Sequence, residues 1–187
     1  MHPKTHPHLR IGEVVLRTGR YDEMRSWYRF LLDLDPYYEN LPAGRNEPGP
    51  DRAAWATQVR LAFFRLSLDH PYQQVIALFD VPGTGALDPT AAGLHHMQLR
   101  EDSLQSLATD YRRLKANGIV PFRTVDHGPS MSFYYKDPDS NVVELAASNH
   151  ATVDAYLASL DSAEFRRNPS GSPVDADRVT GEGGARG

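Results

Sequence analysis

The sequence contains no cysteine, no long apolar segment and no concentration of positive charge. Without cysteine there can be no disulfide, no thiolate metal site and no cysteine nucleophile. No stretch approaches the roughly 18 apolar residues of a transmembrane helix, and the first ten residues lack the apolar core of a signal peptide. The 20 Lys and Arg residues are outnumbered by 24 Asp and Glu residues. These absences predict a cytoplasmic protein that binds neither nucleic acid nor membranes.

What the sequence does contain is enough apolar material for a packed core. Of the 187 residues, 40% are hydrophobic, and seven Phe, nine Tyr and two Trp are among them. This length and composition predict a single domain over residues 1–187. Residues 1–8, which carry His2, His6 and His8, are expected to form a flexible arm. Residues 161–187 are rich in Arg, Gly, Ser, Pro and Asp and predict a mostly irregular C-terminal tail with a mobile end.

Between these ends, the pattern of apolar residues repeats one order of elements. Residues 9–82 predict a first module and residues 93–148 a second, each running strand, helix, strand, strand, strand. The segments, in chain order, are 11–18, 21–34, 37–39, 59–67 and 73–79, then 94–100, 103–118, 120–124, 130–136 and 142–147. A short helix is expected over 150–160. The pattern therefore predicts an α+β protein built from two paired βαβββ modules.

Within the two helical segments, apolar residues recur every three or four positions. Met24, Trp27, Tyr28, Leu31 and Leu32 form one stripe in the first helix, which predicts a face packed on the sheet. In the second helix, the sequence offers an N-cap at Asp102 or Ser103 and a stop at Gly118.

Three polar residues stand on the predicted strands where apolar residues would be usual. Glu13 opens the first strand, His96 lies in the first strand of the second module, and Glu144 lies in the last strand. Each residue alone is compatible with a side chain that faces solvent. Together, two carboxylates and an imidazole on equivalent strands of a repeat indicate a metal site. Since side chains alternate faces along a strand, only one of His95 and His96 can take part.

Longer motifs around these residues resemble those of a known family. HGPSMSFYYKDPDSNVVEL (127–145) resembles the C-terminal signature of type I extradiol ring-cleaving dioxygenases. GLHHMQLR (93–100) resembles their histidine strand, and EVVLRTGRYDEMRSWYRFLL (13–32) resembles their opening segment. An N-P-x-G segment at 168–171 occurs in the one-domain biphenyl-2,3-diol 1,2-dioxygenases as well. Over residues 9–150, the chain thus resembles the vicinal-oxygen-chelate (glyoxalase/bleomycin-resistance/extradiol dioxygenase) superfamily.

This resemblance implies a fold and a set of site residues. The two modules would form an open eight-stranded barrel-like cleft. Glu13, His96 and Glu144 would bind one divalent metal, with Fe(II) expected and Mn(II) or Zn(II) as alternatives. Tyr134 matches the tyrosine that hydrogen-bonds a substrate oxygen in the family, and His127 is the candidate acid/base.

Two residues depart from the family pattern. The family usually has His at the position of Glu13, so the ligand set here is harder and more negative, and it discriminates less among metals. Ser140 replaces the usual glycine of the turn, which the turn can absorb. His95, on the opposite side of its strand from His96, is expected to be packed rather than catalytic.

The function implied by the resemblance is ring cleavage of a catechol-type aromatic diol. One alternative is a metal-dependent glyoxalase- or epimerase-like isomerase or lyase of the same superfamily. Another is a small-molecule (drug) binding protein. The substrate is expected to depend on the loop 40–58 and on the cleft walls, where the strands carry the candidates Phe63, Phe64, Phe133 and Tyr135. A homodimer is expected, because a second chain often covers exposed strand edges.

Overall fold

The computed structural model describes residues 8–41, 59–86, 88 and 90–181. The chain divides into two compact units, residues 1–86 and 87–187, and each is described by itself. The expectations for the arm before His8, for positions 42–58 of the long loop and for the last six residues lie outside the described residues. Within the described part of the chain, no helix is long and apolar enough to span a membrane.

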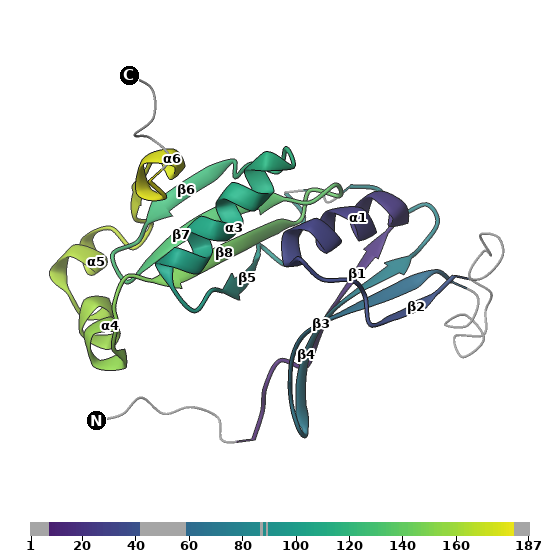
Figure 1. Cartoon of the computed structure of the whole chain (residues 1–187), viewed down its shortest axis with the longest axis horizontal. Coiled ribbons are helices and arrows are strands. Elements are labelled where there is room, and N and C mark those ends of the chain that lie inside the picture. The colour runs from purple at the N-terminus through teal and green to yellow at the C-terminus, as the bar shows by residue number, and fades with distance from the viewer. Residues whose placement is uncertain (1–7, 42–58, 87, 89, 182–187) are drawn as a thin grey trace. The chain divides into compact units, whose positions relative to one another are not determined.

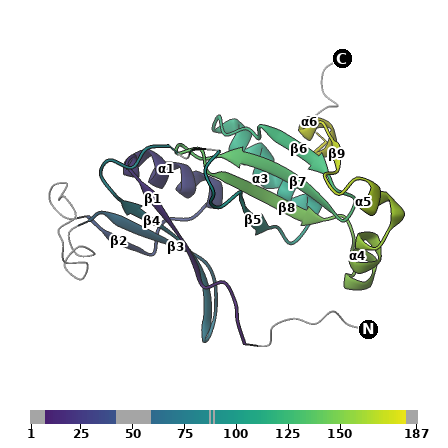
Figure 2. The same ribbon diagram turned by 180° about the vertical axis from the view of Figure 1, so that it is seen from behind.

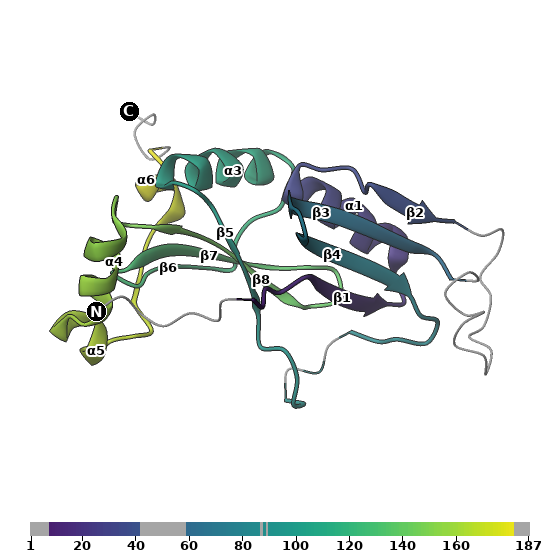
Figure 3. The same ribbon diagram turned by 90° about the horizontal axis from the view of Figure 1, so that it is seen from below.

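The first unit is a four-stranded sheet with one helix (Figures 1 and 3). Its strands lie in the order β1-β4-β3-β2, with β1 parallel to β4 and the other neighbours antiparallel. The elements are β1 (Glu13–Thr18), α1 (Tyr21–Leu32), β2 (Tyr38–Asn40), β3 (Leu61–Asp69) and β4 (Tyr72–Asp80). This is the predicted βαβββ order.

Helix α1 covers one face of the first sheet. Met24, Tyr28 and Leu31 of the predicted stripe are buried, whereas Trp27 is only partly buried. The ring of Tyr28 lies 6.4 Å from that of Phe64 on β3, which is itself fully buried. The three-and-four spacing thus places Met24, Tyr28 and Leu31 in the core, as predicted, while Trp27 and Leu32 lie at its edge.

The second unit repeats this order and then extends it. Its strands lie in the order β5-β8-β7-β6-β9, with β5 parallel to β8 and the other neighbours antiparallel. The repeat elements are β5 (Met97–Arg100), α3 (Leu104–Ala116), β6 (Arg123–Asp126), β7 (Ser130–Lys136) and β8 (Val142–Ser148). The extension contains α4 (Val153–Leu160), α5 (Ala163–Arg167), β9 (Ser172–Pro173) and α6 (Ala176–Val179). Short elements therefore occupy part of the tail that was expected to be mostly irregular.

Helix α3 begins and ends where the sequence indicates. The Ser103 hydroxyl accepts the backbone N–H of Ser106 in a capping box, and Gly118 follows the helix with a φ of +76°. The helix packs on one face of the second sheet, where Tyr111 lies 5.4 Å from Phe133 between ring centroids. Figure 1 shows α3 in front of β7 and β8, and Figure 2 shows the same strands from behind.

The turn between β7 and β8 orders the strand that carries Glu144. One oxygen of the Asp137 carboxylate accepts the backbone N–H groups of Asp139 and Asn141. Ser140 has a φ of +70°, a left-handed conformation that explains why the family prefers glycine there. The turn absorbs the serine as expected. Two mixed sheets in βαβββ order confirm the α+β class and the repeat.

Candidate functional site

Each sheet has a far face, defined here as the face turned away from its helix. On the second sheet, Gln98, Glu144, Tyr134 and Arg123 stand opposite one another on four neighbouring strands. Residues paired in this way point to the same face. The covered face carries their neighbours in sequence, among them the buried Phe133 that contacts α3. The far face of the second sheet therefore holds a row of polar side chains, although strands this central are usually apolar.

Glu144 is the centre of this row. Its residue is only 2% exposed, and both carboxylate oxygens have partners. Gln98 donates from Nε2 to Oε1 at 2.9 Å, and His96 Nε2 lies 3.1 Å from Oε2. A carboxylate buried to this extent is costly unless it is paired, so the two neighbours stabilise its charge.

The two histidines differ from expectation in one respect. The prediction that His95 and His96 lie within a strand is wrong, because β5 begins at Met97, the first residue to pair with β8. Because the two histidines precede the strand, their side chains need not point to opposite faces. The His95 side chain is exposed rather than packed, and its Nδ1 lies 2.7 Å from Nδ1 of His96. The side chain of His96 is 35% exposed. His96 thus has one ring nitrogen towards Glu144 and the other towards His95.

Tyr134 and His127 form a second pair beside Glu144. The Tyr134 hydroxyl lies 3.1 Å from His127 Nε2, and His127 Nδ1 lies 3.1 Å from the carbonyl oxygen of Pro169. Tyr134 is 7% exposed, and its ring lies 5.9 Å from that of His96. Burial and the nearby Glu144 carboxylate raise the pKa of Tyr134, against the opposing charge of Arg123, which lies over its ring. The tyrosine is therefore a neutral phenol at neutral pH and can donate a hydrogen bond.

Glu13 belongs to the far face of the first sheet. It is the exposed first residue of β1, and strand alternation places it on the same face as Val15 and Arg17. This face is aromatic further along: Phe63 lies 6.1 Å from Phe79 and 5.8 Å from Tyr38 between ring centroids. Phe63 is partly buried.

The remaining aromatic candidates lie in the cores. Phe64 is buried on the covered face of the first sheet, and Phe133 and Tyr135 are buried on that of the second. Of the four candidates for the cleft walls, only Phe63 stands on a far face.

No group of three or more His, Asp or Glu side chains that could hold a metal ion occurs among residues 8–41, 59–86, 88 and 90–181. His96 and Glu144 are in contact within the second unit, and Glu13 is described within the first. The ligand set of Glu13, His96 and Glu144 therefore stays a prediction. Of its members, His96 and Glu144 are in contact with each other.

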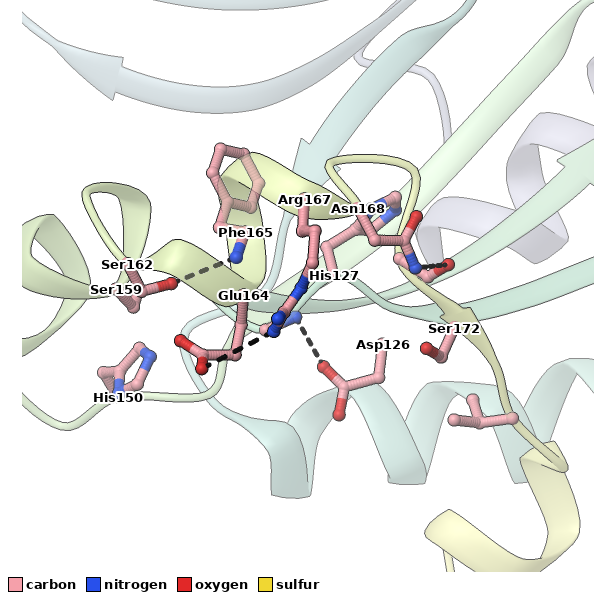
Figure 4. A pocket seen from close by; sticks show the side chains of 13 residues that line it. Asp126, His127, His150, Ser159, Ser162, Glu164, Phe165, Arg167, Asn168 and Ser172 are labelled. Atoms are coloured by element: carbon pink, nitrogen blue, oxygen red, sulfur yellow. Dashed lines mark hydrogen bonds and ion pairs between the residues drawn. The ribbon is translucent and has the colours of Figure 1, made fainter.

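A cavity of about 530 Å³ lies beside His127 within the second unit (Figure 4). The end of β6 and the turn after it contribute Asp126 and His127, and the chain after β8 contributes His150, Glu164 and Arg167. Its walls come largely from the region that sequence reasoning treated as a tail. In this cavity, the Glu164 carboxylate lies 3.8 Å from the Arg167 guanidinium.

Sequence reasoning missed three residues that complete the site. Gln98 holds one oxygen of Glu144, Arg123 lies over Tyr134, and Pro169 contacts His127 through its carbonyl. A usable signal existed for Gln98, since the strand predicted over 94–100 would place it on the same face as His96. For Pro169, the only signal was the turn-forming N-P-x-G segment.

Known proteins share this fold and much of this sequence. Two biphenyl-2,3-diol 1,2-dioxygenases of Rhodococcus globerulus, numbers 2 and 3, are 33% and 32% identical to the chain. The first match covers 89% of this chain and 77% of the relative, and the second covers 88% and 78%. A crystal structure of a glyoxylase/bleomycin resistance protein/dioxygenase domain from Frankia sp. EAN1pec has a TM-score of 0.53 and 18% identity, covering 79% of this chain and 96% of that one. Residues 10–145 match the sequence profile of one family, and with these relatives they show that the chain belongs to the Glyoxalase/Bleomycin resistance protein/Dioxygenase superfamily.

Proposed function

We propose that the protein is a metal-dependent dioxygenase that cleaves the ring of a catechol-type aromatic diol beside its hydroxyl groups. The observation that carries this proposal is the pair formed by the Tyr134 hydroxyl and His127 Nε2 next to the Glu144–His96 contact. A proton donor–acceptor pair beside a buried carboxylate and an imidazole is suited to a substrate that must lose and regain protons. The two relatives named as dioxygenases of an aromatic diol support the same reaction.

The donor set fits a divalent metal. The buried Glu144 carboxylate and the partly exposed His96 imidazole lie 3.1 Å apart, and a cation between such groups would satisfy both. Glu13, on the far face of the other sheet, would supply the third ligand. When bound, the metal supplies a positive charge that favours ionisation of the diol, and the redox chemistry that dioxygen requires. Fe(II) is the proposed metal.

The protein's own residues would handle the protons. The Tyr134 phenol, kept neutral by burial and by Glu144, donates a hydrogen bond to a substrate oxygen. His127 Nε2, on the other side of that hydroxyl, accepts a proton from the substrate and later returns it, either directly or through Tyr134. The aromatic far face of the first sheet, with Phe63 and Phe79, suits a flat apolar ring.

The runner-up function is an isomerase or lyase that uses the metal only as a Lewis acid. Glu13 favours it, because two carboxylates and one imidazole bind Mn(II) or Zn(II) about as readily as Fe(II). Such an enzyme would turn over without dioxygen.

The test starts from protein loaded anaerobically with Fe(II) and mixed with catechols of one and two rings. After dioxygen is admitted, the proposal predicts stoichiometric oxygen uptake and a coloured, ring-opened product. Activity that persists without oxygen, or no oxygen uptake with any diol, would contradict it. Protein loaded with Mn(II) or Zn(II) and assayed without oxygen distinguishes the isomerase.

Tyr134→Phe tests the role of the hydroxyl. We expect kcat to fall by roughly 10²- to 10⁴-fold, the contribution typical of a positioned acid or base. Metal affinity should be unchanged, because the hydroxyl is not one of the proposed ligands. Tyr156→Phe on α4 is the matched control, since it removes a phenol of the same unit whose ring lies under Arg100, outside the proposed site. Equal kcat values for the two variants would remove Tyr134 from the mechanism.

A further inference from the structure

The chain that follows α5 returns to the strand leading into His127. Ser172 and Pro173 form β9, which pairs antiparallel with Asp126 and Val125 of β6. The backbone N–H of Val174 donates to the Thr124 carbonyl at 3.1 Å, and the Thr124 hydroxyl donates to the Val174 carbonyl. Residues 172–174 are therefore fixed to β6, which ends one residue before the candidate acid/base His127.

The turn at 168–171, just before β9, is held by two hydrogen bonds between its first and last residues. The Gly171 N–H donates to the Asn168 carbonyl at 3.1 Å, and Asn168 Nδ2 donates to the Gly171 carbonyl at 2.9 Å. Between them, the Pro169 carbonyl lies 3.1 Å from His127 Nδ1. Figure 4 shows Asn168 beside His127 at the edge of the cavity.

Gly171 permits this close approach. Its φ is +72°, and a Cβ built there would lie 2.4 Å from Val125 Cγ1, 2.5 Å from the Asp126 carbonyl oxygen and 2.9 Å from His127 Nδ1. Backbone atoms cannot move aside as a flexible side chain can. A side chain at position 171 would therefore push the turn away from His127.

The contact decides which nitrogen of His127 carries the proton. A carbonyl oxygen only accepts hydrogen bonds, so Nδ1 must be the N–H donor to Pro169. A neutral imidazole has one N–H, which leaves a lone pair on Nε2, 3.1 Å from the Tyr134 hydroxyl. We infer that the turn 168–171 is a positioning element that fixes His127 in the Nδ1–H form, so that Nε2 is the proton acceptor towards Tyr134 and the substrate. The catalytic half of this inference rests on the proposed function.

Asp126 and Asn149, which lie near His127, use their hydrogen bonds on the backbone of the turn and on each other. One oxygen of Asp126 already accepts the Gly128 N–H and Asn149 Nδ2, each at 2.8 Å. Asn149 Nδ2 also reaches the Gly128 carbonyl at 2.9 Å. These bonds fix the backbone of the turn between β6 and β7 but do not involve the imidazole, which among the described residues hydrogen-bonds the Pro169 carbonyl and the Tyr134 hydroxyl.

The test compares Gly171→Ala with Gly118→Ala. Both glycines have positive φ values, +72° and +76°, but a Cβ at position 118 meets nothing within 4 Å. The two substitutions therefore share the backbone strain and differ in the clash with His127. Histidine ¹⁵N NMR at a pH where His127 is neutral reports the tautomer directly, and the His127→Gln spectrum assigns its signals.

We expect the Nδ1–H tautomer of His127 in the wild type and in Gly118→Ala, and a mixture with the Nε2–H tautomer in Gly171→Ala. For diol cleavage, kcat of Gly171→Ala should fall by roughly 10- to 100-fold, as for loss of an orienting partner, while KM changes little. A wild-type Nε2–H tautomer would overturn the inference, and so would unchanged His127 signals in Gly171→Ala.

The wild-type spectrum keeps the test decisive even if Gly171→Ala does not fold, and Asn168→Ala then provides a milder change that removes one bond of the turn. The spectrum requires no turnover. If the tautomer is as expected but no diol is cleaved, the proposed function fails while the structural role of the turn stands.

Discussion

The two units of this protein share one architecture but place different chemistry on it. In both, a helix buries apolar side chains against one face of a sheet in which the first strand of the βαβββ repeat is parallel to the fourth. The covered faces are alike: Tyr28 packs near Phe64 in the first unit, and Tyr111 packs near Phe133 in the second. Covered faces are constrained by packing, so any repeat of this fold must make them apolar.

The far faces differ. That of the second sheet carries a connected polar network in which Glu144 links Gln98 and His96, and Tyr134 links to His127. That of the first sheet carries an aromatic cluster around Phe63 and the exposed Glu13. The second unit therefore carries the residues to which the proposal assigns proton and metal chemistry, whereas the far face of the first carries aromatic rings and an exposed carboxylate. The two modules thus share the same elements and apolar covered faces, and they differ in the side chains on their far faces, which do not pack against a helix of the same module.

The strongest way to break this comparison is to remove a carboxylate from each unit. We expect Glu144→Gln to lower the affinity for Mn(II) by at least about 100-fold, beyond the effect of losing an outer partner of a ligand. Glu13→Ala should lower it by roughly 10- to 100-fold, with a change in stability within about 0.5 kcal/mol because the residue is exposed. Isothermal titration of the metal-free protein with Mn(II) measures both.

Glu101→Gln is the control for these variants, because Glu101 is a partly buried glutamate of the second unit outside the proposed ligand set. Its Mn(II) affinity should equal that of the wild type. Unchanged affinity in Glu13→Ala would show that the second unit binds metal alone, and the division of labour between the units would then be wrong.

A smaller effect is expected from the aromatic face. Phe63→Ala should raise KM for a catechol by roughly 10-fold, the equivalent of about 1.4 kcal/mol of lost contact with an aromatic ring. The metal affinity should not change, since no ligand is touched. Phe30→Ala on α1 is the matched control, because Phe30 is 45% exposed on the helix of the same unit. Steady-state kinetics in oxygen-saturated buffer measure KM. Equal KM values for both variants would show that Phe63 does not take part in substrate binding.

The sequence predicted the covered faces well because they follow local periodicity. The stripe in α1 and the cap at Ser103 depend on neighbours within a few positions. Tyr134 and Glu144 were singled out by the resemblance to the family, and the strand register places them opposite each other on one face of the sheet.

What the sequence could not give depends on partners distant in the chain. The start of β5 is set by pairing of Met97 with Val143, 46 positions away, and this is why both histidines before it fall outside the strand. The elements in the tail have too few residues to show a period. Strand β9, only two residues long, exists because β6 supplies its hydrogen-bonding partners. The contact between Pro169 and His127 depends on that pairing in turn.

The smallest expected effect concerns a carboxylate of the second unit whose pKa is perturbed without any link to the proposed chemistry. Burial, followed by the neighbouring Asp110, raises the pKa of Glu101 to about 7. Since the pKa is higher in the folded state, the stabilisation is present below the ordinary value of 4.5 and is lost as the pH rises through about 7. Because the side chain is partly exposed, solvent screening limits the loss to about 1 kcal/mol or less.

Between pH 5 and pH 8, the wild type should therefore lose more in Tm than Glu101→Gln, whose amide does not ionise, by at most about 2–4 °C. Glu164→Gln is the control, since the side chain of Glu164 is 79% exposed and its Tm should follow the wild type across this range. Differential scanning calorimetry at the two pH values measures the difference. If Glu101→Gln and the wild type lose the same Tm, the perturbed carboxylate is not Glu101, and the polar network on the far face becomes the next place in the second unit to look for pH-dependent stability.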